Sequence, residues 1–304
     1  MIKKYLFLFV ALLLITWAWD SATQSIAGAS GLAVSPGGLL IQNVKPGEPY
    51  NITEVSGVTL NISNKDSIPH TYVITTHKPS TVAAGKWIKG YLEIPDPSWF
   101  KLEKNEISIK AHQTEKIKMY IEIPDDERYY NQSWSVALLV KGKTGPGQSV
   151  ALAVAPRYEI ETIGKTGLTI TPDGIVSLEP HLIILENFIP GKKKKATVML
   201  YNNDDKKHTY KISPMIFAQD TGKSMISLSP GYSWIPDVKW IKPKKSVLKV
   251  GPGEKGLISF SVKIPKDQNN FNRKWEVILF CEPDKGPSRF MRVHVDTKKS
   301  QLDL

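Results

Sequence analysis

Polar and apolar residues alternate along two long stretches of the chain, residues 116–123 and 257–264. Successive side chains of a β-strand point to opposite faces of a sheet, so a two-residue period predicts strands with one buried and one solvated face. Residues 58–62 and 196–201 are also rich in strand-forming residues, and each run is followed by an Asn/Asp/Lys turn. The pattern therefore predicts a protein built mainly of short strands.

Two further runs, residues 135–140 and 276–281, are more continuously apolar. Such density is typical of central strands that are covered on both faces, as in a core of two packed sheets. Turn-forming residues separate the runs, for example at 46–48, 142–147 and 252–254. No segment beyond the N-terminal region sustains a 3.6-residue period, so we expect no long helix there.

An internal repeat is the most informative feature of the sequence. Residues 90–99 match residues 231–240 at an offset of 141, and the same offset aligns Trp134 with Trp275. Upstream, residues 70–74 match residues 208–212 at an offset of 138. The length changes fall between the matching blocks, where loops are expected. We infer a duplication with units near residues 31–158 and 166–298.

The predicted fold class is all-β, with two tandem immunoglobulin-like β-sandwich domains, since each unit holds about seven strands and no helix. The residues that carry this pattern are a Pro-Gly-Glu turn, an alternating strand ending in Ile-Pro, and a strand led by Trp134 or Trp275. The arrangement resembles immunoglobulin-like modules of exported bacterial and archaeal surface proteins, and it is similar to PapD-like and major-sperm-protein-like sandwiches. That resemblance implies a scaffold, an adhesive part or a chaperone, without catalysis.

The N-terminus reads as an export signal. Lys3 and Lys4 precede an apolar run over residues 5–19, and small residues at Ala27 and Ala29 offer a cleavage site. An uncleaved anchor formed by residues 5–19 is the alternative. The predicted organisation is therefore a signal or anchor over 1–29, a first domain over 30–160 and a second over 161–304. Export predicts a location in the periplasm, at the cell surface or outside the cell.

Net charge separates the two units. The 304 residues carry a formal charge of +11, with 40 Lys plus Arg against 29 Asp plus Glu. Residues 30–160 hold 14 basic and 13 acidic residues, whereas residues 161–304 hold 24 and 15. The excess in the second unit is led by a set of lysines: Lys192, Lys193, Lys194, Lys195, Lys242, Lys244 and Lys245. These lysines are either an ordinary solvated surface or a docking face for anionic lipid, an envelope polymer or an acidic protein. Export makes nucleic acid an unsuitable partner.

The repeated Ile-Pro-Asp motif offers a second candidate site, formed by Asp96 and Trp99 in the first unit and by Asp237 and Trp240 in the second. A ring and a carboxylate could hold a sugar. In the structural interpretation, which the retention in both copies favours, the Asp caps backbone donors and the Trp covers one end of the sandwich.

The remaining reactive side chains indicate no chemistry. His70 and His208 are equivalent but lie in no cluster with metal-ligand spacing, and no catalytic fingerprint occurs, so we expect no metal, no cofactor and no enzyme activity. Cys281, the single cysteine, aligns with Val140 and is expected to be a buried small hydrophobe. Sequons at Asn51, Asn61 and Asn131 permit glycosylation in a secreted chain.

The sequence thus favours a non-catalytic exported scaffold that binds other envelope or surface proteins, or a second copy of itself, through sandwich faces or edges. Two alternatives stay open. One is a module that binds carbohydrate or an anionic envelope polymer, and the other is a periplasmic chaperone-like protein.

Overall fold

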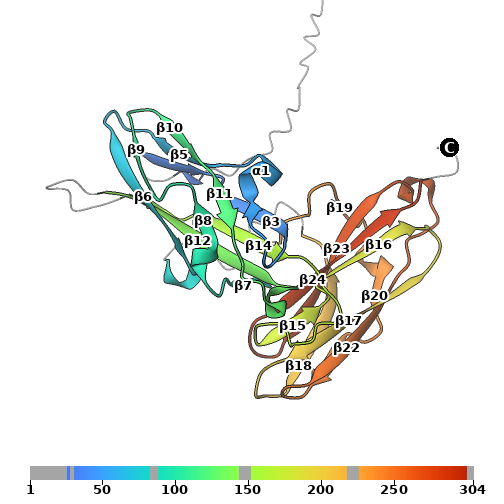
Figure 1. Cartoon of the computed structure of the whole chain (residues 1–304). Helices are drawn as coiled ribbons and strands as arrows, with labels where there is room; N and C mark the ends of the chain where they lie inside the picture. Colours follow the sequence, from blue (N-terminus) through green and yellow to red (C-terminus); the bar gives the residue numbers. More distant parts are fainter. Residues whose placement is uncertain (1–25, 28–30, 83–87, 144–151, 218–225, 300–304) are drawn as a thin grey trace, which may run out of the picture.

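The computed structural model consists of two β-sandwich units joined at an angle (Figure 1). It describes residues 26–27, 31–82, 88–143, 152–217 and 226–299. The predicted signal over 1–29 lies outside these residues, apart from Ile26 and Ala27. The all-β prediction with two tandem sandwiches is confirmed by the strand content and the sheet order.

The first unit contains the following strands: β1 (Ile26–Ala27), β2 (Leu32–Ser35), β3 (Gly38–Val44), β4 (Tyr50–Asn51), β5 (Leu60–Asn64), β6 (His70–His77), β7 (Leu92–Glu93), β8 (Phe100–Leu102), β9 (Glu106–Ile109), β10 (Thr114–Ile117), β11 (Met119–Ile121), β12 (Ser133–Gly142), β13 (Ala153–Val154) and β14 (Arg157–Thr162). One layer holds the orders β1-β2-β5-β10 and β4-β11-β8, and the other holds β3-β14-β12-β6-β9. A single apolar core fills the space between the layers.

The second unit contains these strands: β15 (Val176–Glu179), β16 (Leu182–Phe188), β17 (Lys194–Asn202), β18 (His208–Met215), β19 (Ser233–Trp234), β20 (Ile241–Pro243), β21 (Val247–Val250), β22 (Lys255–Val262), β23 (Lys274–Pro283) and β24 (Arg289–Thr297). Its sheets have the orders β15-β17-β22-β20 and β16-β24-β23-β18-β21, with a separate core between them. Cys281 lies in that core with no exposure, as its alignment with Val140 predicts.

The duplication is visible in matching hydrogen bonds. The side-chain amide of Asn64 donates to the carbonyl oxygens of Ile68 and Ile109, at 2.7 and 3.2 Å. Asn202 repeats this pattern toward Lys206 and Val250, again at 2.7 and 3.2 Å. In each unit the buried amide donates to one carbonyl in the turn after its own strand and to one carbonyl on a strand of the opposite sheet. The same residue type therefore satisfies the same buried carbonyls in both units.

The two units differ in the strands predicted from alternating polar and apolar residues at 116–123 and 257–264. In the second unit the alternation forms one strand, β22, whereas the first unit breaks it at Lys118 between β10 and β11. The break arises because β10 pairs with β5, while β11 pairs with β4 and β8. The alternation itself continues across the break, since Ile117, Met119 and Ile121 all face the core.

The helical content is low. The helix α1 (Ile52–Ser56) begins at Asn51, whose side chain accepts from the backbone N–H of Glu54, and it ends at Gly57 with a φ of 71°. Five 3₁₀ turns complete the described helices: η1 (Pro79–Thr81), η2 (Pro97–Trp99), η3 (Glu127–Tyr129), η4 (Val238–Trp240) and η5 (Gln268–Asn270). No helix within the described ranges is long and apolar enough to cross a membrane.

Candidate functional site

The repeated Ile-Pro-Asp motif forms the same cap in both units. The Asp96 carboxylate accepts from the backbone N–H of Ser98 at 2.8 Å, at the start of η2. Asp237 accepts from the N–H of Lys239 at 2.8 Å, at the start of η4. Each aspartate thus satisfies a backbone donor at a tight turn, which is the capping role of the structural interpretation. The hydrogen bond to Ser98 also lowers the pKa of Asp96.

The two tryptophans of the motif are covered to different extents. Trp99 is 9% exposed and packs edge-on against Tyr129 at a centroid distance of 4.9 Å and beside Trp134 at 5.7 Å. Trp240 is half-buried against the core of the second unit. The Trp99 ring is therefore part of an aromatic cluster that closes one end of the first sandwich, and it offers little face for a sugar to stack on.

The predicted lysines are all exposed, and the fold gathers two distant groups of them on one sheet. Lys195 on β17 lies opposite Ser261 of β22, and Lys242 on β20 lies opposite the same serine from the other side. Directly opposed residues of antiparallel strands share a face, so Lys195 and Lys242 flank Ser261 on the outer face. Lys194 departs from this group because its ammonium donates to the carbonyl oxygen of Glu186 at 3.1 Å.

The outer face of the other sheet in the second unit meets the first unit. Ile278 and Phe280 of β23 and Phe290 of β24 form an apolar cluster with Tyr91 of the first unit and with Ile226. These strands are therefore buried on both faces, which explains why residues 276–281 are so continuously apolar. Sequence analysis expected such density from a sandwich core alone.

A buried ionic network lies beside this apolar cluster, between β14 of the first unit and β23 and β24 of the second. Arg292 donates through Nε and Nη2 to both carboxylate oxygens of Glu161, at 2.7 Å each, and through Nη1 to Glu276 at 2.5 Å. His294 shares a hydrogen with the second oxygen of Glu276 at 2.7 Å. All four side chains are nearly excluded from solvent.

Neutral groups complete the network from both units. Tyr91 donates to Glu161, and Gln42 donates to Glu161 at 2.8 Å and to Ser229 at 3.0 Å. Because nearly every polar atom of the two carboxylates and the guanidinium has a partner, the buried charges are compensated. The network therefore sets the two units in one relative arrangement.

The pKa values of the acidic and histidine side chains in and beside the network are strongly shifted. Burial alone would raise the pKa of Glu161, but the charge and hydrogen bonds of Arg292 lower it to about 2. Glu159, two residues earlier on the same face of β14, has no such partner, and burial together with the Glu161 charge raises its pKa to about 8. Burial also lowers the pKa of His181, beside this junction, to about 4.

Sequence reasoning missed this network. The signal that was present is the alternation of charged and apolar residues in 157–161 and 290–295. That alternation indicates one face outside the core, but it does not distinguish a solvated face from one covered by a second domain. The distinction needs the packing of the two units.

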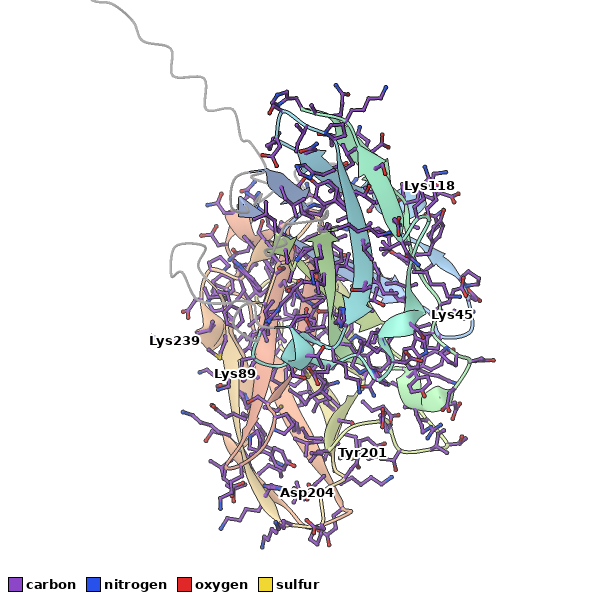
Figure 2. All side chains as sticks on the ribbon, turned by 90° about the vertical axis from the view of Figure 1, so that its left-hand side faces the viewer. Lys45, Lys89, Lys118, Tyr201, Asp204 and Lys239 are labelled. Carbon is purple, nitrogen blue, oxygen red and sulfur yellow. The ribbon has the colours of Figure 1, made fainter. Side chains whose placement is uncertain are left out.

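His208 forms a second polar cluster, at the far end of the second unit. Its ring nitrogens bond to Asp204 at 2.8 Å and to Asp284 at 2.9 Å. These two carboxylates raise the pKa of His208, and the hydrogen bond from His208 contributes most to lowering the pKa of Asp204 to about 2. Figure 2 shows Asp204 near one end of the molecule, away from the labelled lysines Lys45 and Lys118 of the first unit. Within the described residues, no group of three or more His, Cys, Asp or Glu side chains could hold a metal ion.

The edge strand β21 leaves part of its backbone open. Ile212 of β18 donates to the carbonyl of Ser246 at 2.8 Å, and Lys211 lies opposite Val247. This geometry makes Lys211 and Val247 a non-hydrogen-bonded pair, so the N–H and C=O of Val247 point away from β18. By the same register, the N–H and C=O of Lys249 also point to the open edge.

A shallow hollow of about 370 Å³ adjoins this edge. It is mostly apolar and is lined by Thr209, Lys211, Ser246, Val247, Glu282, Pro283 and Asp284. The Val247 side chain is 48% exposed beside it. An open backbone edge next to an apolar hollow is the arrangement that an added strand can use, with main-chain bonds for affinity and a hollow for one side chain.

Comparison with solved structures finds distant matches. A crystal structure of a protein of unknown function from Porphyromonas gingivalis W83 is 14% identical, with a TM-score of 0.33, over 88% of this chain and 99% of that chain. The periplasmic chaperone SfaE is 12% identical, with a TM-score of 0.31, over 86% and 99%. The PapD-like domain 7 of human CEP192 is 13% identical, with a TM-score of 0.27, over 45% and 94%. The PapD-like resemblance inferred from the sequence is thus found again among the similar structures.

No family model and no curated protein matches the chain. Identities and TM-scores this low do not define a function, which therefore has to be inferred from the residues described above.

Proposed function

We propose that this chain is a non-catalytic exported protein that binds other envelope or surface proteins by strand addition to β21. The observation that carries the proposal is the outward direction of the Val247 and Lys249 backbone groups beside the apolar hollow. Export is supported by the basic and apolar N-terminal residues, which have the order of a secretory signal.

The partner that fits this edge is an extended segment with an apolar or β-branched residue. Such a segment would pair its backbone with Val247 and Lys249 and place one side chain against Val247 and Pro283 in the hollow. Lys249, exposed on the same strand, protects the free edge from indiscriminate pairing, since a charged edge residue disfavours apolar aggregation.

The buried network supports a scaffold role. It joins the first unit to the second through Glu161 and Arg292, so a protein held at β21 is presented at a set position relative to the first unit. The carbohydrate alternative has less support, because the Trp99 ring is packed against Tyr129. The chaperone-like alternative uses the same edge and adds the release of the bound protein to another.

A proline substitution tests the edge directly. In Val247→Pro the lost N–H is one that points away from β18, so the β18–β21 ladder keeps its hydrogen bonds. Leu248→Pro is the matched control, since Leu248 lies in the alternate register and its N–H bonds to β18. We expect Val247→Pro to keep the thermal stability of the chain and to lose binding to the envelope proteins that the wild-type chain binds.

The readout that locates the contact is amide hydrogen exchange on the full chain with a retained partner. The Val247 and Lys249 amides should exchange fast in the free chain and slowly in the complex, while the Leu248 amide is slow in both. Partners that bind Val247→Pro as well as the wild type, or protection at another edge, would contradict the proposal. Protection that depends on the concentration of the chain alone would identify a second copy as the partner. Transfer of the bound protein to a third one would favour the chaperone-like alternative.

A further inference from the structure

The outer face of the sheet formed by β15, β17, β22 and β20 carries a field of positive charge. We define the basic face as the lysines on β17, β20, β22 and their connecting loops: Lys192, Lys193, Lys195, Lys239, Lys242, Lys244, Lys245, Lys255, Lys263 and Lys266. All are exposed, and none forms an ion pair with an acidic side chain in the described part of the chain. Figure 1 shows these strands on the side of the second unit that faces away from the first, and Figure 2 labels Lys239 at the margin of the molecule.

The first unit provides an internal reference for this face. The N–H of Glu122 donates to the carbonyl of Trp99 at 2.9 Å, and Lys263 repeats that bond to Trp240 at 2.9 Å. Glu103 donates in the same way to Lys118 at 3.0 Å, and Lys244 repeats that bond to Ser259 at 2.8 Å. Lys263 and Lys244 therefore occupy the backbone positions that Glu122 and Glu103 hold in the first unit.

These equivalent positions have opposite charge. In the first unit Lys101 forms an ion pair with Glu122. In the second unit the same two positions hold two cations, Lys242 on β20 and Lys263 directly after β22. At the same offset of 141, Lys266 replaces Asp125. The sandwich accepts carboxylates at these sites, and adjacent like charges destabilise a sheet, so folding gives no reason for the lysines.

The chemistry of the face points to a diffuse anionic surface. Every member is a lysine, and the arginines of the second unit lie elsewhere. Arginine is favoured where a single phosphate is held by two parallel hydrogen bonds, whereas lysine supplies a mobile point charge. The lysines spread over three strands and four connecting segments. A hollow of about 200 Å³ on this side is lined by only two of them, Lys244 and Lys245.

Apolar groups lie among the lysines. Leu257 on β22 is 54% exposed on the same outer face, and Ile189 is 41% exposed in the loop that leads to Lys192. An exposed apolar residue among lysines suits the boundary between lipid headgroups and acyl chains, where the side chain is buried while the ammonium groups meet anionic headgroups.

We propose that the basic face binds the surface of an anionic lipid bilayer and thereby holds the second unit against a membrane, independently of the partner edge at β21. The face and the β21 edge use different residues, so each can be tested by substitutions that leave the residues of the other unchanged.

Substitutions that restore the residues of the first unit test the proposal. The triple variant Lys244→Glu, Lys263→Glu and Lys266→Asp places at each site a side chain that the same fold carries in the first unit. It also lets Lys242 pair with the glutamate introduced at position 263, as Lys101 pairs with Glu122 in the first unit. The matched control is Lys65→Glu, Lys110→Glu and Lys116→Glu, which changes net charge by the same amount on exposed lysines of the first unit.

The measurement is co-sedimentation of the full chain with vesicles of phosphatidylglycerol and phosphatidylcholine in equal parts, compared with phosphatidylcholine alone. Comparison between variants removes any contribution of the apolar residues 5–19, which all chains share. We expect binding to the anionic vesicles to fall about a hundredfold in the triple variant, the loss for three lysines worth about 1 kcal/mol each near an anionic surface. Wild-type binding should also weaken between ~0.1 M and ~1 M salt, as the screening length shortens from about 10 to about 3 Å.

Three results would overturn the proposal. One is equal binding to both kinds of vesicle by the wild type, and another is an equal loss in the matched control, which would reduce the effect to net charge. The third is retention of a soluble anionic polymer, such as polyphosphate, with no binding to anionic vesicles. Val247→Pro should bind the vesicles like the wild type, so failure of the β21 proposal and failure of this one are distinguishable.

Discussion

Arg292 on β24 binds both carboxylate oxygens of Glu161 on β14, at 2.7 Å each, and so joins the second unit to the first through a buried two-point ion pair. Such a pair holds two domains at a set angle, because a parallel fork of hydrogen bonds fixes direction as well as distance. Its contribution to stability appears when one partner is removed, since the remaining charge stays buried.

Glu161→Gln should therefore be strongly destabilising. Arg292 would keep Glu276 as its only anionic partner, and we expect the free energy of unfolding to fall by about 3 kcal/mol, the lower end of the range for broken buried pairs. Urea unfolding of the full chain measures the change. Lys89→Ala is the matched control, because Lys89 pairs with Glu282 across the same junction but both side chains are exposed. Its effect should stay below about 1 kcal/mol, and equal losses in the two variants would contradict the role given to burial.

Glu159 should make the chain less stable as pH rises. Burial and the Glu161 charge raise the pKa of Glu159 from 4.5 to about 8 in the folded chain. Between these two values the folded state holds a proton that the unfolded state has released, so the free energy of unfolding falls with pH across this window. The total loss is on the order of 5 kcal/mol, at about 1.4 kcal/mol for each pKa unit.

Glu159→Gln tests this directly, because the amide carries no charge at any pH. The variant should match the wild type at low pH and exceed its stability above pH 8, as followed by urea unfolding across the window. A constant difference between the two chains at every pH would show that Glu159 does not titrate there.

His208 should add a pH dependence in the second unit. Asp204 and Asp284 raise the pKa of His208, so its contribution is fully present below the unfolded value of 6.5 and is lost as pH rises through the folded value. The Asp204 pKa is lowered to about 2, so the carboxylate side of the cluster contributes above its unfolded value of 3.8 and is lost as pH falls toward 2. The cluster thus stabilises most in mildly acidic solution.

The measurement is the melting temperature of the wild type and of His208→Gln over this range. The difference between them should be largest near pH 5 to 6 and shrink toward higher pH. The difference in melting temperature excludes the contribution of Glu159, because both chains contain this residue. A difference that grows with pH would exclude a stabilising imidazolium.

The two aspartate caps should be equivalent. Asp96→Ala and Asp237→Ala each remove the acceptor for one backbone N–H, and we expect each to cost about 0.5–2 kcal/mol of stability. Asp96→Asn and Asp237→Asn keep an acceptor oxygen and should recover most of the loss. Alanine variants with wild-type stability would remove the capping role and return the motif to the sugar-binding hypothesis.

The sequence predicted most of the sandwich framework, because its signals are local or repeated. The alternation of residues 257–264 becomes β22, and Cys281 lies buried as its alignment with Val140 requires. The fold also decides whether the sequon at Asn131 is accessible for glycosylation in the folded chain. That side chain is buried and donates to the carbonyl of Lys165 at 2.6 Å, so the folded chain does not offer it for modification.

Long-range relationships were beyond the sequence. Lys195 and Lys242 are 47 residues apart, and only the pairing of β17, β22 and β20 places them on both sides of Ser261. Arg292 and Glu161 lie 131 residues apart, and each sits on a strand face that a single domain would leave wet. Neither relationship has a local pattern, because it depends on how sheets pair and how units pack. The limits at 29 and 160 likewise stay predictions, and β14 continues to Thr162.

The apolar cluster at the junction makes the second unit dependent on the chain that precedes it. Cut away from the first unit, a fragment of the second unit would present Ile278, Phe280 and Phe290 to water on one sheet face, next to Arg292 without Glu161. A patch of that kind promotes aggregation. During synthesis the first unit is complete before β23 and β24 emerge, so it can act as an intramolecular template on which the second unit closes.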